Sequence, residues 1–218
     1  MHFEILVEDQ SGKVMLDGLI PKVLGAGHTF RVHSYKGIGR IPKGLKTVAD
    51  VQKRILLDQL PRLLAGFGNT FIKYGENYRA VVIVVCDLDR KNRVIFEEEL
   101  CELAAASHPR PEYSFCLAVE EGEAWFLGDL PAIRAAYPKA KDMILQSYVN
   151  DSICGTWEKL ADAVFPGGSA ALRAGGWMAA GAEKSRWARE ITPHMRPDTN
   201  QSPSFQEFLA TMERISSS

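Results

Sequence analysis

The feature that most constrains the fold of this sequence is an uninterrupted apolar run, residues 80–86, that leads directly into Asp87 and Asp89. The run is rich in valine, and an apolar segment of this length without polar alternation is typical of a strand buried on both faces of a parallel sheet. Side chains two positions apart in a strand project to the same side, so both carboxylates are expected to point at one place. That place is the carboxyl edge of the sheet, where open α/β folds bind their ligands.

Two further predicted strands also end in acidic residues. The first predicted strand ends in Glu8, and the last is followed by Glu120 and Glu123. Because the carboxyl ends of parallel strands meet at one edge of a sheet, these acids are expected to converge with Asp87 and Asp89. Converging carboxylates repel one another unless a cation lies between them, and a divalent metal ion is the usual cation. The alternative is structural, with one Asp capping the next helix and the other in solvent.

Strand and helix patterns alternate over the first part of the chain, which is typical of an α/β fold. The predicted strands cover residues 2–8, 29–34, 80–89 and 114–119, and the predicted helices between them cover residues 11–24, 48–67 and 94–106. The strand pattern then disappears, and only helices are predicted. We therefore predict an α/β domain, residues 1–130, with a mostly parallel sheet of about four strands flanked by helices, and a C-terminal helical extension, residues 131–218, packed on it.

The chain has a net charge of -1, from 26 Lys and Arg against 27 Asp and Glu, which excludes nucleic-acid binding driven by overall charge. Any contact with nucleic acid must therefore come from a local basic patch or a metal ion. The candidates for phosphate contacts are Lys36, Arg40 and Lys43 in a glycine-containing loop, and Arg90 after the acidic strand. Glycine amides and spaced cations suit phosphate binding, although a solvated basic loop is the alternative interpretation.

The cysteine pattern and the hydrophobic pattern together predict a cellular compartment. Four cysteines form no Cys-x-x-Cys pair, which argues for reduced thiols rather than a disulfide framework or a zinc site. No basic-then-apolar leader precedes the first predicted strand, and no apolar run approaches the length of a membrane span. We therefore expect a cytoplasmic protein that does not associate with membranes.

A metal ion held by the acidic residues would suit chemistry on phosphate esters, because it neutralises an anionic substrate and activates a water molecule. Glu8, Asp87 and Asp89 are the predicted catalytic residues, with Glu8 as the candidate general acid or base. Three cations of the C-terminal region could reach the same edge as phosphate contacts, although a surface helix explains them equally well. These three are Lys184, Arg186 and His194.

Other classes of protein also place Asp-x-Asp after a strand. Haloacid-dehalogenase-type phosphatases use it at their first strand with Thr or Val two residues later, where this sequence has Lys91. Response-regulator receivers are shorter, and their central strand ends in a lone Asp. Sugar-nucleotide transferases need a nucleotide fingerprint, which does not precede Asp87 here. A serine or cysteine hydrolase is disfavoured because no Gly-x-Ser-x-Gly segment exists and Cys86 lies within the buried strand.

Three segments carry a more specific resemblance: Leu6-Val-Glu-Asp9, Val85-Cys-Asp-Leu-Asp89, and Glu120-Glu-Gly-Glu-Ala-Trp125 with Gly128-Asp129. Together with residues 151–158 and 202–205, they resemble a family of small, uncharacterised bacterial Toprim-like proteins. That family is distantly similar to the Toprim domains of overcoming-lysogenization-defect nucleases, primases and topoisomerases. The resemblance covers most of the chain, and Glu-Ala-Trp with a nearby Asp is its most distinctive part.

The resemblance implies a Toprim-like fold and magnesium-dependent phosphodiester chemistry on nucleic acid, that is, a nuclease or phosphodiesterase. Glu8 would act as general acid or base or as a metal residue, and Asp87 and Asp89 would bind Mg²⁺ or Mn²⁺. Glu120 or Glu123 would supplement these metal ligands. Topoisomerase activity is disfavoured, because it needs a nucleophilic tyrosine in a separate domain for which the chain has no room.

One departure from the family pattern leaves a second interpretation open. Toprim nucleases commonly carry a second acid shortly after the first Glu, whereas Gly12 or Lys13 stands in that place here. The alternative is therefore a catalytically degenerate binding or regulatory module that acts with a partner ATPase, since such ATPases neighbour members of the family. The sequence does not determine the oligomeric state.

Overall fold

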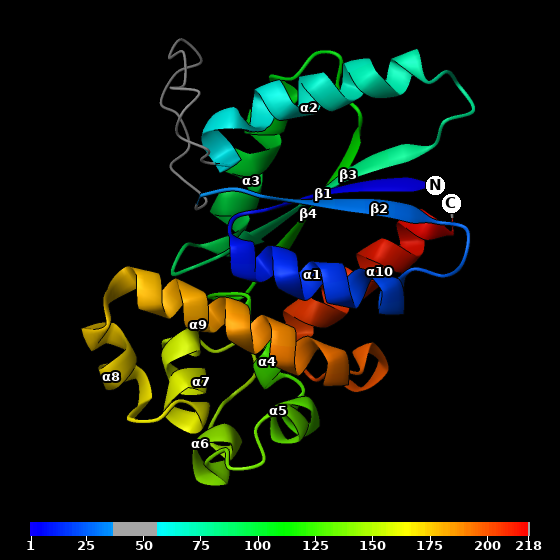
Figure 1. Cartoon of the computed structure of the whole chain (residues 1–218). Coiled ribbons are helices and arrows are strands. Elements are labelled where there is room, and N and C mark those ends of the chain that lie inside the picture. Colours follow the sequence, from blue (N-terminus) through cyan, green and yellow to red (C-terminus); the bar gives the residue numbers. More distant parts are fainter. Residues whose placement is uncertain (37–55, 218) are drawn as a thin grey trace.

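The computed structural model describes residues 1–36 and 56–217, and within them it has an α/β fold built on one sheet of four parallel strands (Figure 1). The order of the strands in the sheet is β2-β1-β3-β4, and every pairing is parallel. The predicted α/β class, with about four mostly parallel strands flanked by helices, is therefore confirmed. The strands are β1 (His2–Val7), β2 (Thr29–Ser34), β3 (Ala80–Asp87) and β4 (Glu112–Ala118).

The side chains of β3 alternate between two hydrophobic cores, one on each face of the sheet. Ile83 packs into the core on the face covered by α1, and Val84 packs into the core covered by α2 and α3. Burial on both faces explains why the β3 sequence lacks polar alternation. Asp87 continues the alternation of Ile83 and faces the α1 side. These helices are α1 (Gln10–Val23), α2 (Leu56–Lys73) and α3 (Arg93–Ala105).

After β4 the described chain is helical, and it gathers on the α1 side of the sheet (Figure 1). α9 packs along α1, and α10 packs against β4. The hydrophobic core on this side includes Trp125, Trp187 and Phe205 together with side chains of β1 and β3. The division into domains 1–130 and 131–218 stays a prediction. These helices are α4 (Glu123–Leu127), α5 (Leu130–Ala136), α6 (Asp142–Gln146), α7 (Thr156–Val164), α8 (Gly168–Ala174), α9 (Gly176–Ile191) and α10 (Pro203–Ser216).

The helix predicted over residues 48–67 differs most from the structure. Its first residues lie outside the described residues, and α2 continues past the predicted end to Lys73. α2 continues through Gly68, and at this residue the helix contacts the loop that precedes β4. A Cβ at Gly68 would lie 2.2 Å from the carbonyl oxygen of Pro109. No helix within residues 1–36 and 56–217 is both long and apolar enough to cross a membrane.

Candidate functional site

The carboxyl ends of β1, β3 and β4 open into a small pocket on the α1 side of the sheet. Glu8 follows β1, Asp87 ends β3, and Glu123 begins α4 after β4, and all three residues line the pocket. Lys184 of α9 lines the same pocket. The cavity is small, with a volume of about 30 Å³, and is large enough to admit water. The structure thus places three of the predicted acids around one small space.

Glu8 and Asp87 form a carboxyl pair in this pocket. The two side chains are close enough for the charge of Glu8 to act on Asp87, and Oε2 of Glu8 is fully buried with no hydrogen-bond partner among the described residues. Burial raises the pKa of Glu8 to about 7, and the negative charges of Asp9 and Asp89 add to this effect. Burial also raises the pKa of Asp87 well above its usual value, and the charge of Glu8 is the next cause. Two carboxyl groups this close need a proton or another cation between them.

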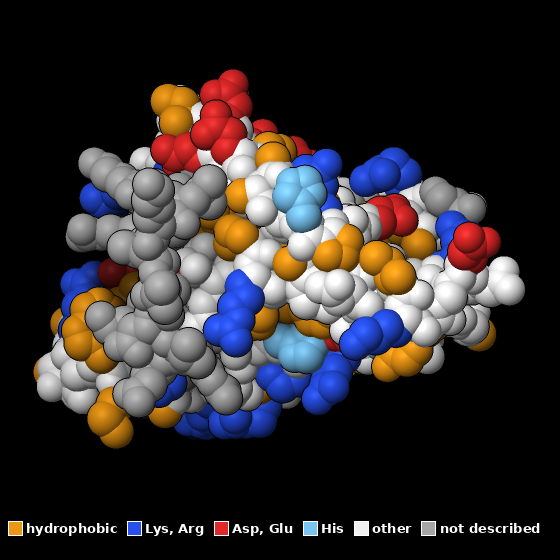
Figure 2. Space-filling view, turned by 90° about the horizontal axis from the view of Figure 1, so that it is seen from above, with side chains coloured by type: hydrophobic (Ala, Val, Ile, Leu, Met, Phe, Trp, Pro, Cys, Tyr) orange, Lys and Arg blue, Asp and Glu red, His pale blue; other side chains and the backbone are white. Residues whose placement is uncertain are grey.

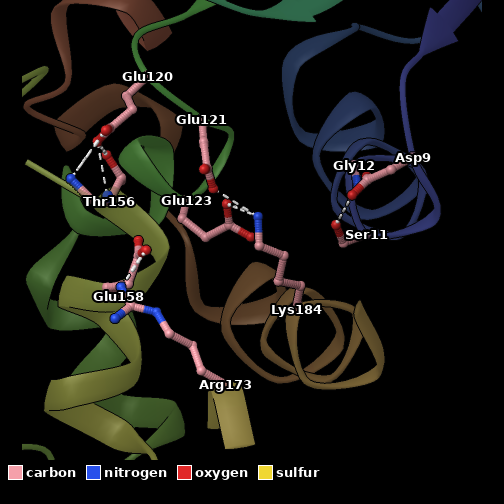
Figure 3. Close-up of polar contacts among 11 residues, drawn as sticks. Asp9, Ser11, Gly12, Glu120, Glu121, Glu123, Thr156, Glu158, Arg173 and Lys184 are labelled. Atoms are coloured by element: carbon pink, nitrogen blue, oxygen red, sulfur yellow. Dashed lines mark hydrogen bonds and ion pairs between the residues drawn. The ribbon is translucent and has the colours of Figure 1, made fainter. Parts of the chain in front are cut away.

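Lys184 supplies a largely buried positive charge to the same pocket, and Figure 3 shows its ammonium turned toward Glu121 and Glu123. Its ammonium lies 2.7 Å from an oxygen of Glu121 and 3.2 Å from an oxygen of Glu123, and its side chain is only 18% exposed. Burial by itself lowers the pKa of Lys184, but the carboxylates of Glu123, Glu121 and Asp87 outweigh burial and raise it. Lys184 is therefore charged at neutral pH and neutralises the β4 side of the pocket.

Asp89 lies outside the pocket, although its spacing from Asp87 predicts that both point at one place. β3 ends at Asp87, so strand alternation does not extend to Asp89, whose backbone has a φ of 52°. Its carboxylate is 51% exposed and pairs with Lys91 at 2.5 Å. The charge of Asp89 still contributes to the raised pKa of Glu8. Its role as a metal ligand or catalytic group stays a prediction.

Glu120 binds the start of α7 and points away from Lys184 (Figure 3). Its carboxylate accepts hydrogen bonds from the backbone amides of Cys154, Gly155 and Thr156, and from the hydroxyl of Thr156 at 2.5 Å. Burial by itself raises the pKa of Glu120, but these hydrogen bonds outweigh burial and lower it. The geometry favours an ionised anchor for α7, and metal binding by Glu120 stays a prediction.

A network of buried hydrogen bonds fixes the segment after β4 to distant parts of the chain. Nε1 of Trp125 donates to Oγ of Ser204 at 3.1 Å, and the side-chain amide of Asn200 donates to the carbonyl oxygen of Trp125 at 2.7 Å. Asp151 accepts a hydrogen bond from the backbone amide of Ser204 at 2.6 Å. A buried hydrogen-bond network in which every polar group has a partner makes the surrounding structure rigid. This network therefore holds α4, and with it Glu123, at the edge of the sheet.

The turn from β1 into α1 sets the position of Glu8. Asp9 caps α1 by accepting two hydrogen bonds of 2.7 Å from the next residues of the turn (Figure 3). Lys13 stands where the family resemblance implies a second acid, and its ammonium donates to Asp17 and to the carbonyl oxygen of Val32. The first turn of α1 contains no acidic residue. α1 therefore adds no second carboxylate beside Glu8.

The predicted phosphate contacts are only partly described. Arg40 and Lys43 lie outside the described residues, whereas Lys36 and Arg90 are exposed. Seen from the side of α2 and α3, several Lys and Arg side chains gather along the lower edge of the view (Figure 2). Such a gathering is a local basic surface on a chain with almost no net charge. The roles of the four predicted contacts stay predictions.

Of the three C-terminal cations considered from the sequence, only Lys184 lines the acidic pocket, while Arg186 and His194 are exposed. The sequence carries a signal for this difference, because Lys184 falls on the buried stripe of α9, three residues before Trp187. A lysine on a buried helical face needs an acidic partner. Glu121 is one of the acids that follow the last predicted strand and are expected to converge at this edge, but its pairing with Lys184 is not indicated by the sequence.

The five predicted acids do not form one compact metal cluster. Within the described part of the chain, no three side chains of His, Cys, Asp or Glu are grouped so as to hold a metal ion. The remaining candidate metal ligands are the carboxylates of Glu8 and Asp87. Oε2 of Glu8 has no hydrogen-bond partner among the described residues. Magnesium is usually bound through one or two carboxylates, with water and substrate phosphate completing its octahedron. The pair therefore fits one Mg²⁺ or Mn²⁺ ion.

The fold and the site define a class of protein: a parallel α/β protein with an acidic pocket at the carboxyl edge of its sheet, into which a C-terminal helix inserts a lysine. Residues 7–213 match the family described as Domain of unknown function (DUF4276), and the chain belongs to this family. No curated protein and no solved structure matches the chain. The matched range contains Glu8, Asp87 and Lys184, so the whole pocket lies within the family domain.

We predict that the stability of the metal-free protein falls as the pH rises from about 4.5 to above 7. The pKa of Glu8 is raised from 4.5 to about 7, so its contribution to stability is complete below the unfolded value and is lost as the pH passes the folded value. Glu8→Gln should remove on the order of 3 kcal/mol of this pH dependence, measured by urea unfolding across the range. Burial also raises the pKa of Glu121 to about 7, so wild type and variant are compared, and their difference reports Glu8 together with its effect on Asp87. Identical pH profiles for the two proteins would contradict the prediction.

We predict that Glu120→Gln lowers the free energy of unfolding by about 1–3 kcal/mol, because a neutral amide is a weaker acceptor for the amides that start α7. The pKa of Glu120 is lowered in the folded protein, so the loss should be present above pH 4.5 and should vanish as the pH falls through the folded pKa. Denaturant unfolding measures the loss, with Glu98→Gln on the exposed face of α3 as control. Unchanged stability together with lost Mn²⁺ binding would instead make Glu120 a metal ligand.

Proposed function

We propose that this chain carries out magnesium-dependent phosphodiester chemistry on nucleic acid, at a site with a Toprim-like arrangement. The observation that carries the proposal is the buried Glu8–Asp87 pair at the ends of adjacent parallel strands, with Oε2 of Glu8 unpartnered among the described residues. Two carboxylates suit Mg²⁺, which commonly completes its coordination with substrate phosphates. The resemblance of the strand-end motifs to Toprim-like proteins supports the same chemistry.

Within this proposal each charged group has a distinct role. A bound Mg²⁺ would supply charge neutralisation at a phosphate and a more acidic water molecule. Glu8 and Asp87 would hold the ion, and the resemblance adds Asp89 as a further ligand and Glu120 or Glu123 as a supplement. In the metal-free protein the pKa of Glu8, about 7, leaves this group partly protonated near neutral pH, and metal binding would displace that proton.

Substrate binding would fall to basic residues that contact the nucleic-acid backbone, because phosphate contacts position a strand without reading its sequence. Lys36 and Arg90 are exposed and available for such contacts, and Arg40 and Lys43 lie outside the described residues. The nearly neutral chain has no overall field to attract nucleic acid. Binding should therefore depend on the metal ion as well as on these residues.

The second candidate function is a catalytically degenerate Toprim-like module that binds a ligand and regulates, or is regulated by, a partner ATPase. Two observations favour it. Lys13 occupies the place of the second acid and turns toward Asp17, and Lys184 places a fixed cation within the acidic pocket. In that case the carboxyl pair would bind a metal ion without any hydrolysis.

The test of the first proposal compares wild type with Asp87→Asn, which keeps the shape of the side chain and removes its charge. We expect Mn²⁺ binding, measured by calorimetry, to be lost in the variant, and hydrolysis of single-stranded DNA or of bis(p-nitrophenyl) phosphate to fall about a hundredfold or more. Asp198→Asn is the matched control, because Asp198 is 69% exposed and pairs only with Arg196 in the described structure. This control should bind and hydrolyse as wild type does.

Two outcomes would separate the candidates. Full activity in Asp87→Asn would contradict the proposed phosphodiester chemistry at this site. Metal binding by wild type, lost in Asp87→Asn but without turnover of any nucleic acid or model diester, would favour the degenerate module.

A further inference from the structure

We propose that the acidic edge accepts a single divalent ion, because the ammonium of Lys184 takes the position of a second cation. This inference rests on the proposed function, since it assumes that Glu8 and Asp87 bind a divalent ion. It concerns the stoichiometry of the site and assigns to Lys184 the role of a positioning residue.

The acidic edge consists of two halves with different charge states. In the first half, Glu8 and Asp87 face each other without a cation in hydrogen-bond contact among the described residues. In the second half, Glu121 and Glu123 both pair with Lys184, at 2.7 and 3.2 Å (Figure 3). Glu123 and Lys184 line the same pocket as the first pair, so the two halves are contiguous. Among the described residues, the first half therefore has no directly paired cation, whereas the second half pairs with Lys184, whose charge also acts at longer range on Glu8 and Asp87.

The packing of α9 holds the ammonium in place. Trp187, Ala188 and Ile191 bury the same face of α9 in the core, and α9 packs along α1, the helix that directly follows Glu8. The ammonium of Lys184 also lies 5.9 Å from the centre of the Trp157 ring. A buried ammonium without its partners, or buried carboxylates without theirs, would be strongly destabilised. Lys184 therefore stays in the site whether or not a metal ion is bound.

The second half of the edge is already occupied by a cation. The cavity between the two halves is small, with a volume of about 30 Å³, and Lys184 forms part of its wall. A second divalent ion would need Glu121 and Glu123 as ligands and would have to lie beside the ammonium of Lys184. Two such cations at contact distance repel each other strongly in a partly buried site. Lys184 thus excludes a second ion both by occupying its ligands and by its charge.

The test is a calorimetric titration of Mn²⁺ into the full chain and its Lys184→Met variant. We expect wild type to bind one ion per chain. Lys184→Met keeps the apolar stem and removes the charge, so it should bind a second ion at Glu121 and Glu123. The first ion should then bind roughly tenfold more tightly or better, because a neighbouring positive charge is gone. Arg189→Met, which removes an exposed charge from the same helix, is the matched control and should bind one ion with unchanged affinity.

The outcomes separate this inference from the function on which it rests. Two ions bound by wild type, or one ion still bound by a folded Lys184→Met variant at unchanged affinity, would overturn the single-ion inference and leave the proposed function standing. No binding by wild type would overturn both. Lys184→Gln replaces Lys184→Met if circular dichroism shows that the latter does not fold, and Lys184→Arg, which keeps the charge, should bind one ion. A wild-type count of two overturns the inference without any variant, whereas the role of Lys184 is tested by the variants.

Discussion

Two carboxyl groups are forced together because β1 and β3 are adjacent parallel strands in fixed register, with Val7 opposite Val85. Glu8 and Asp87 follow this pair of valines by one and two residues, so the sheet itself delivers them to one edge. Burial and their mutual proximity raise both pKa values, and Oε2 of Glu8 has no hydrogen-bond partner among the described residues. The function proposed for the protein depends on how this uncompensated charge is neutralised.

The helices after β4 pack against the carboxyl edge of the four-stranded sheet and contribute side chains to the acidic pocket. α9 inserts Lys184 beside Glu123, α7 is tied to the end of β4 through Glu120, and α10 is tied to α4 through Ser204 and Trp125. Each of these contacts joins a residue near the acidic edge to one far along the chain. The C-terminal extension is therefore part of the site. Substitutions of residues in this extension, such as Lys184, should change the charge of the acidic pocket.

The sheet could be predicted from the sequence because a continuous apolar run such as 80–86 has few other structural solutions. The convergence of Glu8 and Asp87 followed from the same pattern, since parallel strands share a carboxyl edge. The placement of Asp89 could not be predicted, because it depends on where β3 ends and on the left-handed backbone that follows. The pairing of Lys184 with Glu121 depends on helix packing across more than 60 residues of chain, which local patterns do not encode.

The central claim is that one divalent ion binds between Glu8 and Asp87 while Lys184 keeps its own carboxylates. Anomalous diffraction from crystals of the full chain soaked in Mn²⁺ tests this claim most directly, because it locates each ion as well as counting them. The account predicts one anomalous peak in contact with Glu8 and Asp87, with the ammonium of Lys184 still paired to Glu121 and Glu123. A peak bound to Glu121 and Glu123 with Lys184 displaced, or a second peak beside the first, would contradict it.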